Sequence, residues 1–293
     1  MDKKHSLGIS SLLASTVLFA GMGTLVKVLH TQGIDSYKVA LFRFAIGISL
    51  LGTLAMFKKI KLEFHNSGIL FLRGLFGGIA VYLYILSIYK IGLAKGTVIS
   101  SSAPIFATIG SILFLGEKSS LKKWGLVLLA VFGIVLIAAA REGDLSGFGL
   151  WEGLAVVGAI TAGGAYVTIK KLSTTDSPYA IFLAQSLIGF WLVITPANLI
   201  PCRIGIGGGV ILLVMGLTAA SGQLLMTYGF KFVTVSTGSL LGFLTTVINV
   251  FIGILIFKEK IGLIGIVGSA MVITACVLII TIQKEDTPAP RPR

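Results

Sequence analysis

Apolar residues fall in ten long stretches that are bounded by charged or polar residues and separated by short connections. Each stretch has about 20 residues, enough for a helix to cross roughly 30 Å of hydrocarbon at 1.5 Å per residue. A helix also satisfies its own backbone hydrogen bonds in lipid. The pattern therefore predicts an all-α integral membrane protein with ten transmembrane helices: Leu7–Leu29, Tyr37–Phe57, Gly68–Tyr89, Ala94–Leu115, Leu121–Ala140, Leu150–Ile169, Tyr179–Leu199, Val210–Phe230, Val235–Phe257 and Ile261–Ile282.

The composition supports this interpretation. Charged residues make up 12% of the 293-residue chain and apolar residues 55%, whereas a soluble chain has about 25% charged residues. The net charge of +13 accompanies no basic stripe on a soluble module, so we expect it to face the lipid bilayer and expect no nucleic-acid partner. Cys202 and Cys276 give no metal-ligand spacing, and no metal or cofactor is expected.

Lysine and arginine are distributed unevenly between the connections. With the N-terminus inside, fourteen of them fall in inside segments, and six fall outside: Lys90, Lys95, Arg141, Arg203, Lys258 and Lys260. The positive-inside rule then predicts both termini in the cytoplasm, with the chain in the cell (inner) membrane. Met1–Ser6 carries Lys3 and Lys4 before an apolar run, but a signal peptide is not expected, because the run is longer than a signal core and shows no clear small-residue cleavage site.

The two halves of the chain match at an offset of 142 residues. Ile46 and Gly47 fall on Ile188 and Gly189, Tyr37 on Tyr179, Gly74 on Gly216, and the pair Glu117-Lys118 on Glu259-Lys260. Each unit holds five helices, an odd number, so the second must enter the membrane from the opposite side. We therefore predict a first repeat over 1–145, an inverted second repeat over 146–283, and a disordered cytoplasmic tail over 284–293.

Two motif regions resemble a known family. Tyr89-Lys90-Ile91-Gly92, Ser102-Ala103-Pro104-Ile105-Phe106 and Leu115-Gly116-Glu117-Lys118 are similar to the first-repeat signature of the EamA family of the drug/metabolite transporter superfamily. Its second copy resembles Tyr228-Gly229-Phe230-Lys231, Thr245-Thr246 and Phe257-Lys258-Glu259-Lys260. The resemblance implies ten helices, both termini inside, and export or exchange of small metabolites, often amino acids or related compounds.

The chain departs from the family pattern at two places. Thr246 stands where the second copy usually has a proline, the counterpart of Pro104, and Ala20-Gly21 replaces a tryptophan that is common in the first helix. Pro104 is expected about midway along the fourth helix, where it leaves the carbonyl of Ser100 without its helical partner. We predict hinge positions at Pro104 and Thr246, although an ordinary packed kink remains the alternative at Pro104.

Polar residues in the middle of predicted spans are the candidates for substrate contact. Gln223 and Asn249 carry carboxamides that would cost several kcal/mol if they faced lipid, so they should face inward, either binding substrate or linking helices. Ser101 could supply a hydroxyl beside the loosened turn. By the resemblance, Tyr82 and Tyr166 are candidate cavity walls, with packing against neighbouring helices as the alternative.

Basic residues within spans give the strongest chemical signal. Arg43 lies six residues into the second helix, and Lys27 lies near the outer end of the first. No acidic residue occupies the middle of any predicted span, so a substrate carboxylate or phosphate could pair with these cations. Snorkelling to headgroups is the alternative for both, and it is the reading we expect for Arg73. Glu117 and Glu259 are expected to cap loop turns.

These features predict a secondary carrier that works by alternating access and moves a small amphipathic metabolite with an anionic group, with amino acids the leading class. The alternatives are a carrier of a neutral, nucleoside-like or vitamin metabolite, and a non-transporting membrane scaffold. An enzyme is not expected, because the spans contain no paired acids and no histidine. The oligomeric state, a homodimer included, stays open.

Overall fold

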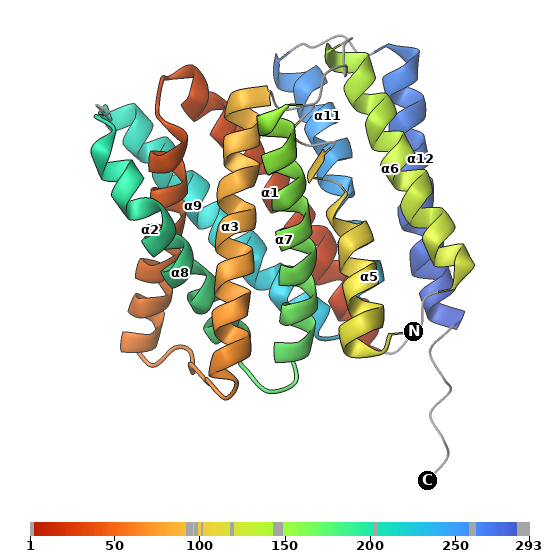
Figure 1. The fold of residues 1–293 in the computed structure, drawn as a ribbon, viewed down its shortest axis with the longest axis horizontal. Coiled ribbons are helices and arrows are strands. Elements are labelled where there is room, and N and C mark those ends of the chain that lie inside the picture. Colours follow the sequence, from red (N-terminus) through yellow and green to blue (C-terminus); the bar gives the residue numbers. More distant parts are fainter. Residues whose placement is uncertain are drawn as a thin grey trace.

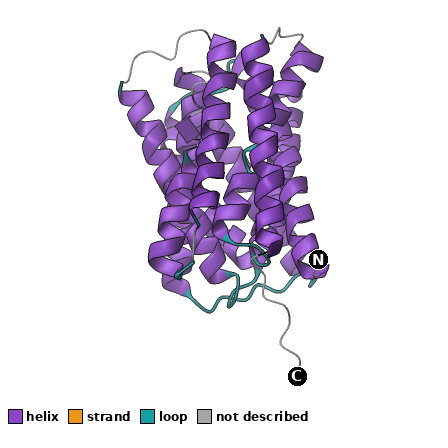
Figure 2. Ribbon diagram, turned by 90° about the vertical axis from the view of Figure 1, so that its right-hand side faces the viewer, coloured by secondary structure: helices purple, strands orange, loops and turns teal. Residues whose placement is uncertain are grey.

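The computed structural model describes residues 3–91, 96, 99–100, 102–117, 120–142, 149–201, 204–257 and 262–285. Within these ranges all regular secondary structure is helical (Figures 1 and 2). The helices are α1 (Lys3–Thr31), α2 (Ser36–Met56), α3 (Ser67–Ile91), α5 (Ala103–Leu115), α6 (Leu121–Glu142), α7 (Leu150–Leu172), α8 (Pro178–Leu199), α9 (Ile206–Phe230), α10 (Val235–Leu241), α11 (Leu244–Phe257) and α12 (Leu263–Glu285).

Six helices, α1, α2, α3, α7, α8 and α9, are long and apolar enough to cross a membrane. The shorter apolar segments are Ala103–Leu115, Val235–Asn249 and Leu263–Leu278. Large apolar side chains are exposed on the outside of the bundle, among them Phe71, Trp191, Leu199 and Ile206. A surface of this kind suits lipid and not water, so the prediction of an all-α membrane protein is confirmed.

The prediction of a continuous ninth helix over Val235–Phe257 is wrong, because the segment is divided into α10 and α11. At the division the N–H of Phe243 donates to the carbonyl of Leu240, and the N–H of Thr245 donates to that of Gly242. These bonds span three residues, so the backbone tightens into a 3-10 turn between the two helices. Hydropathy did not reveal the break because the residues on both sides are equally apolar.

Of the predicted fourth helix, Ala94–Leu115, the residues 94–95, 97–98 and 101 lie outside the described part of the chain. Helix α5 begins at Ala103, after Ser102, and Pro104 lies in its first turn. A proline in a first turn removes an N–H that has no intrahelical acceptor in any case. The expected kink at mid-helix is therefore a new helix start. Gly116, with φ of 64°, ends α5 in the left-handed conformation that glycine favours.

The two halves pack through reciprocal contacts at the 142-residue offset. A Cβ added at Gly74 would strike Ile188, and one added at Gly216 would strike Ile46, its counterpart. The pairs α1–α9 and α3–α7, which exchange under the same offset, are among the three most extensive contacts between the halves. Contacts exchanged in this way require a pseudo-two-fold axis between the repeats, in agreement with the predicted register.

The helix starts repeat in the same way. Asp35 caps α2 by accepting from the N–H of Tyr37, and Ser177, its counterpart 142 residues on, caps α8 by accepting from the N–H of Ala180. Both pairs stand at the connection that leads into the second helix of a repeat. A side-chain cap at the equivalent position therefore sets the start of the second helix in both repeats.

The loops 57–66 and 173–177 lie at one end of the bundle, together with the start of α1 and the end of α12 (Figures 1 and 2). They are joined by the carboxylate of Asp176, which accepts hydrogen bonds from the N–H groups of His65 (2.8 Å) and Asn66 (3.3 Å). We call this arrangement the loop clasp. Burial disfavours the charged form of Asp176, but hydrogen bonds from Thr175, His65 and Asn66 outweigh it and hold the pKa of that carboxyl below 3.8.

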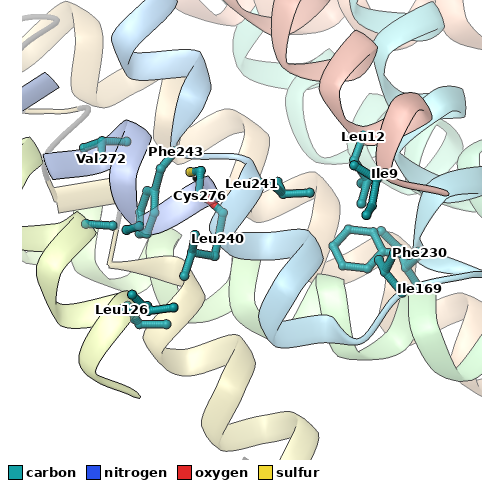
Figure 3. Close-up of a cluster of buried hydrophobic side chains, with 14 of the residues drawn as sticks. Ile9, Leu12, Leu126, Ile169, Phe230, Leu240, Leu241, Phe243, Val272 and Cys276 are labelled. Carbon is teal, nitrogen blue, oxygen red and sulfur yellow. Dashed lines mark hydrogen bonds between the residues drawn. The ribbon is translucent and has the colours of Figure 1, made fainter. Parts of the chain in front are cut away.

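The helices α6 and α12 pack against each other along one side of the molecule (Figure 1). A buried apolar cluster connects them to the rest of the bundle. Figure 3 shows Leu240 and Phe243, at the division between α10 and α11, beside Leu126 of α6 and Cys276 of α12. The broken segment is therefore held from outside by a packed apolar wall, while its other side faces the cavity described next.

Candidate substrate cavity

A cavity of about 230 Å³ lies between the two repeats. It is bounded by α1, α2, α3, α7, α8 and α9 together with the broken segments of α5, α10 and α11. Most of its wall is apolar. The polar side chains that line it are Ser15, Thr16, Arg43, Arg73, Tyr84, Ser100, Tyr166, Gln185, Gln223, Ser239, Thr245 and Thr246.

Arg73 is the most deeply buried charged side chain in this wall, with 1% of its surface exposed. Its Nη2 donates a hydrogen bond of 2.6 Å to Oε1 of Gln185 on α8. Its Nε and Nη1 have no hydrogen-bond partner among the described residues. The expectation that Arg73 snorkels to the headgroups is therefore wrong: the side chain turns inward, where Gln185 accepts from it.

Gly77 makes this position of Arg73 sterically feasible. It lies one helical turn after Arg73 on α3, and a Cβ there would collide with Nη1 of the guanidinium and come within 3.0 Å of Gln185. The amide Nε2 of Gln185 also donates to the carbonyl of Gly77 at 3.2 Å. Gln185 therefore holds the guanidinium through its oxygen while its own nitrogen is fixed to the α3 backbone.

Arg43 lines the same cavity from α2. It is buried, and its Nη1 lies 3.1 Å from Sδ of Met22 on α1. A thioether sulfur is a weak acceptor and carries no charge that could compensate a guanidinium. Tyr84 is within electrostatic range of Arg43, and Tyr166 is within range of Arg73. The inward position that was predicted for Arg43 is present in the structure.

The predicted carboxamides are both buried. Gln223 of α9 lines the cavity, and its Nε2 has no hydrogen-bond partner within the described part of the chain. Asn249 of α11 lies beside Gly23, where an added Cβ would be 3.6 Å from its Nδ2 and 3.8 Å from Oη of Tyr84. Asn249 is therefore close to Tyr84 but is not part of the cavity lining. Tyr166, also predicted, is in the lining.

Two predicted contacts lie elsewhere. Lys27 is half-buried near the end of α1, away from the lining residues. Tyr82 stacks on Tyr37 with ring centroids 4.8 Å apart, and its neighbour Tyr84 reaches the cavity instead. Ser101 lies outside the described residues. The two hinge candidates, Pro104 and Thr246, both line the cavity at a helix break.

The charge of the lining is one-sided. Among the lining residues that the structure describes, Arg43 and Arg73 are cationic and none is acidic. A guanidinium in a medium of low dielectric is costly unless an opposite charge or several acceptors compensate it. Neither arginine has a protein carboxylate beside it in this lining, so the arrangement favours an anionic group in the cavity.

One end of the site is connected by polar contacts between the repeats. Both carboxylate oxygens of Glu117, which follows α5, accept from the N–H of Val235 at the start of α10, each at 3.2 Å. Nearby, Nζ of Lys170 donates to the carbonyls of Phe230 (3.0 Å) and Val233 (2.6 Å). Glu117, which was expected to cap a loop turn, therefore caps the start of a helix in the other repeat. Its counterpart Glu259 lies outside the described residues.

A cavity with several polar side chains between two helical repeats related by a pseudo-two-fold axis is typical of secondary membrane carriers. The sequence matches the EamA-like transporter family twice, over residues 6–139 and 149–281. The chain belongs to this family of transporters, and the resemblance noted in the sequence is confirmed. The two matched ranges coincide with the two packed halves of the structure.

Several relatives are named for the compounds they move. The chain is 25% identical over 280 residues to a pseudopaline exporter of Pseudomonas aeruginosa, covering 94% of this chain and 97% of that protein. It is 25% identical over 296 residues to an S-adenosylmethionine uptake transporter of Rickettsia bellii, covering 97% and 96%. It is 29% identical over 205 residues to a riboflavin transporter of Vibrio cholerae, covering 68% and 65%.

The fold has a counterpart among solved structures. A crystal structure with 14% sequence identity superposes with a TM-score of 0.78, covering 98% of this chain and all of that one. This likeness concerns the fold alone. It shows that the two-repeat helical arrangement is one that a second, distantly related sequence adopts.

Proposed function

We propose that the protein is a ten-span secondary carrier of the cell (inner) membrane, with both termini cytoplasmic, that moves a small amphipathic metabolite carrying an anionic group by alternating access. Amino acids and related compounds are the leading class. The observation that carries the proposal is the pair Arg43 and Arg73 in a cavity whose described lining has no acidic residue. A substrate anion would compensate them and leave again with the substrate.

The size and the chemistry of the cavity narrow the substrate. A volume of about 230 Å³ is smaller than the roughly 300 to 1,000 Å³ of pockets for drug-sized ligands. Apolar parts of the wall are supplied by Phe19, Met22, Met226 and Phe243. A compact molecule with one apolar part and at least one anion fits this combination. The relatives support a small metabolite as cargo, and since they include both an exporter and uptake carriers, they do not fix the direction.

The helix breaks support alternating access. Pro104 at the start of α5 and Thr246 in the first turn of α11 line the cavity from the two repeats, at equivalent places. Irregular backbone at membrane depth is tolerated where it lines a cavity. Because α10 and α11 are separate short helices and α5 begins just before Pro104, these segments can tilt without bending a continuous hydrogen-bonded helix. We propose that these segments move when the cavity changes the side to which it opens.

A neutral metabolite is the second candidate. The unpartnered Nε2 of Gln223 and the ring hydroxyls of Tyr84 and Tyr166 could hold carbonyl or heterocyclic acceptors without an anion. This alternative explains the amides and tyrosines but leaves both guanidinium groups uncompensated. The anionic substrate is therefore the better account of the whole lining.

Counterflow in proteoliposomes tests the proposal. Vesicles containing the purified protein are loaded with an unlabelled amino acid, nucleoside or vitamin, and entry of the same labelled compound is followed. Accumulation that depends on the protein and favours anionic or zwitterionic compounds is expected. Accumulation confined to neutral nucleosides would favour the second candidate, and absence of flux for every class would favour a non-transporting scaffold.

A further inference from the structure

We propose that the substrate carries two separate anionic groups, one bound by Arg73 and Gln185 and the other by Arg43. This inference rests on the proposed carrier function and specifies its substrate class. Compounds of this kind include short dicarboxylates and acidic amino acids. The inference follows from where the two arginines lie in the pseudo-symmetric frame and from what each one contacts.

The two arginines occupy equivalent interfaces of the two repeats. Arg73 lies between α3 and α8, where it donates to Gln185. Arg43 lies on α2, which packs against α9. Under the 142-residue offset, α2 corresponds to α8 and α3 to α9, so the α2–α9 interface is the counterpart of the α8–α3 interface. The residue that corresponds to Arg43 in the second repeat is Gln185 itself. The cavity therefore has one cation on each side of the pseudo-two-fold axis.

The packing of α2 against α8 indicates how far apart these positions are. A Cβ at Gly47 would lie 2.9 Å from Oγ of Ser186, and a Cβ at Gly189 would contact the ring of Phe44. Residue numbers rise on one helix as they fall on the other, so the helices are antiparallel. In this register Gln185 of α8 lies level with a point on α2 that is about five residues after Arg43. At 1.5 Å per residue, the two positions are therefore roughly 7 Å apart along the helix axis.

Each cationic position has capacity for a ligand. Nε and Nη1 of Arg73 are unpartnered within the described residues, although the side chain is almost fully buried and faces the cavity. At Arg43, Nη1 lies 3.1 Å from the thioether sulfur of Met22, a weak and uncharged acceptor that an anionic group can replace. Guanidinium groups bind carboxylates through parallel N–H donors, so each arginine can hold one carboxylate.

Electrostatics favours two anions over one. Arg43 and Arg73 are close enough for their like charges to repel. A ligand with a single negative charge compensates one guanidinium and leaves the other uncompensated in the same low-dielectric cavity. A ligand with two separated carboxylates compensates both at once. The protein should therefore distinguish a dicarboxylate from its monoamide, which has nearly the same shape.

Matched pairs of probes test the inference on the purified full-length protein. The pairs are succinate and succinamate, glutarate and glutaramate, aspartate and asparagine, and glutamate and glutamine, with affinities from ligand-induced shifts of the melting temperature. We expect at least one dianion to bind about tenfold or more tightly than its monoamide. The substitutions R43Q and R73Q should each reduce that ratio to about one, whereas K38Q, on α2 outside the lining, should leave it unchanged.

A second variant covers the case in which R73Q does not fold. Gln185→Glu places a carboxylate beside the intact Arg73, so it should abolish the preference for the dianion while both arginines are retained. Equal binding of dianions and monoamides would overturn the inference but leave the carrier function standing. Retention of the preference in R73Q or in Q185E would also overturn it. Flux in the counterflow assay without binding of any carboxylate would exclude the dianion and keep the carrier.

Discussion

Gln185 occupies in the second repeat the position that Arg43 occupies in the first, and its Oε1 accepts the hydrogen bond from Arg73. The two repeats thus have the same arrangement of helices but carry different side chains, Arg43 and Gln185, at equivalent positions beside the cavity. Where one half places a cation, the other places a neutral amide that orients a second cation. A cavity built in this way is symmetric in its walls and asymmetric in its charges, so a bound substrate has one preferred orientation.

The first prediction concerns Arg43 and transport. R43Q should reduce uptake of an acidic or zwitterionic substrate by at least about a hundredfold, because a charge-assisted hydrogen-bonded pair in a desolvated site contributes about 3 kcal/mol. Insertion should be normal, since glutamine retains polar contacts at the same depth. Initial rates in proteoliposomes measure the effect, with K59Q in the loop before α3 as the control. Unchanged transport by R43Q would exclude Arg43 from the substrate site.

The second prediction concerns Gly77. In G77A the added methyl group would occupy the space of the Arg73 guanidinium, so Arg73 or Gln185 must move. We expect a lower melting temperature and a loss of substrate affinity of about tenfold or more. Gly52, on α2 with nothing within 4 Å of an added Cβ, is the matched control. The control substitution G52A should stabilise the helix by about 0.5 to 1 kcal/mol. Unaltered substrate affinity in G77A would contradict the packing described for Arg73 and Gln185.

The third prediction concerns Thr246. Its N–H donates to the carbonyl of Phe243 at 3.0 Å in the first turn of α11. The substitution T246P would restore the proline that the family pattern has there. Because a first turn tolerates proline, the free energy of unfolding should fall by only about 1 kcal/mol, for the lost hydrogen bond. Transport should persist. Ile252, farther along α11, is the contrasting position, and I252P should cost about 3 kcal/mol or more and reduce the amount of folded protein.

The fourth prediction concerns the loop clasp and pH. The pKa of Asp176 is lower in the folded protein than its ordinary value of 3.8, so its charged form stabilises the fold above that value and the contribution disappears as the pH falls through the folded pKa. D176A should lower the melting temperature at pH 7. The difference from the wild type should shrink on acidification below pH 4. A difference that stayed constant between pH 7 and pH 3 would show that the charge has no part in the clasp.

The sequence predicted the repeat well because its signals are local and occur twice. Ile46 and Gly74, chosen only for their match to Ile188 and Gly216, prove to contact those same residues crosswise in the structure. The capping residues at the starts of α2 and α8 are likewise short-range signals. The alignment of the two repeats could therefore be predicted without knowledge of any tertiary contact.

The charged part of the site was harder to predict. Depth along a helix does not tell whether an arginine turns inward or toward headgroups, and for Arg73 the direction depends on Gln185, 112 residues away, and on the space that Gly77 leaves. Gln185 itself could have been found, because a carboxamide in the middle of a span is costly in lipid and this one aligns with Arg43. Hydropathy did not show the helix breaks, since their flanks are as apolar as intact helices, and only Pro104 and its counterpart Thr246 marked these positions in the sequence.

The cap that Glu117 places on α10 has a mechanical consequence. It attaches the end of a helix in one repeat to the start of a helix in the other, beside the carbonyls that Lys170 binds. If the repeats separated at this end, the first turn of α10 and the Glu117 carboxylate would lose their hydrogen bonds, whereas Lys170 and its two acceptors, all in the second repeat, would stay together. We therefore expect the contact between Glu117 and Val235 to hold the two repeats together at this end, and its loss would leave a single uncompensated carboxylate at the seam between them.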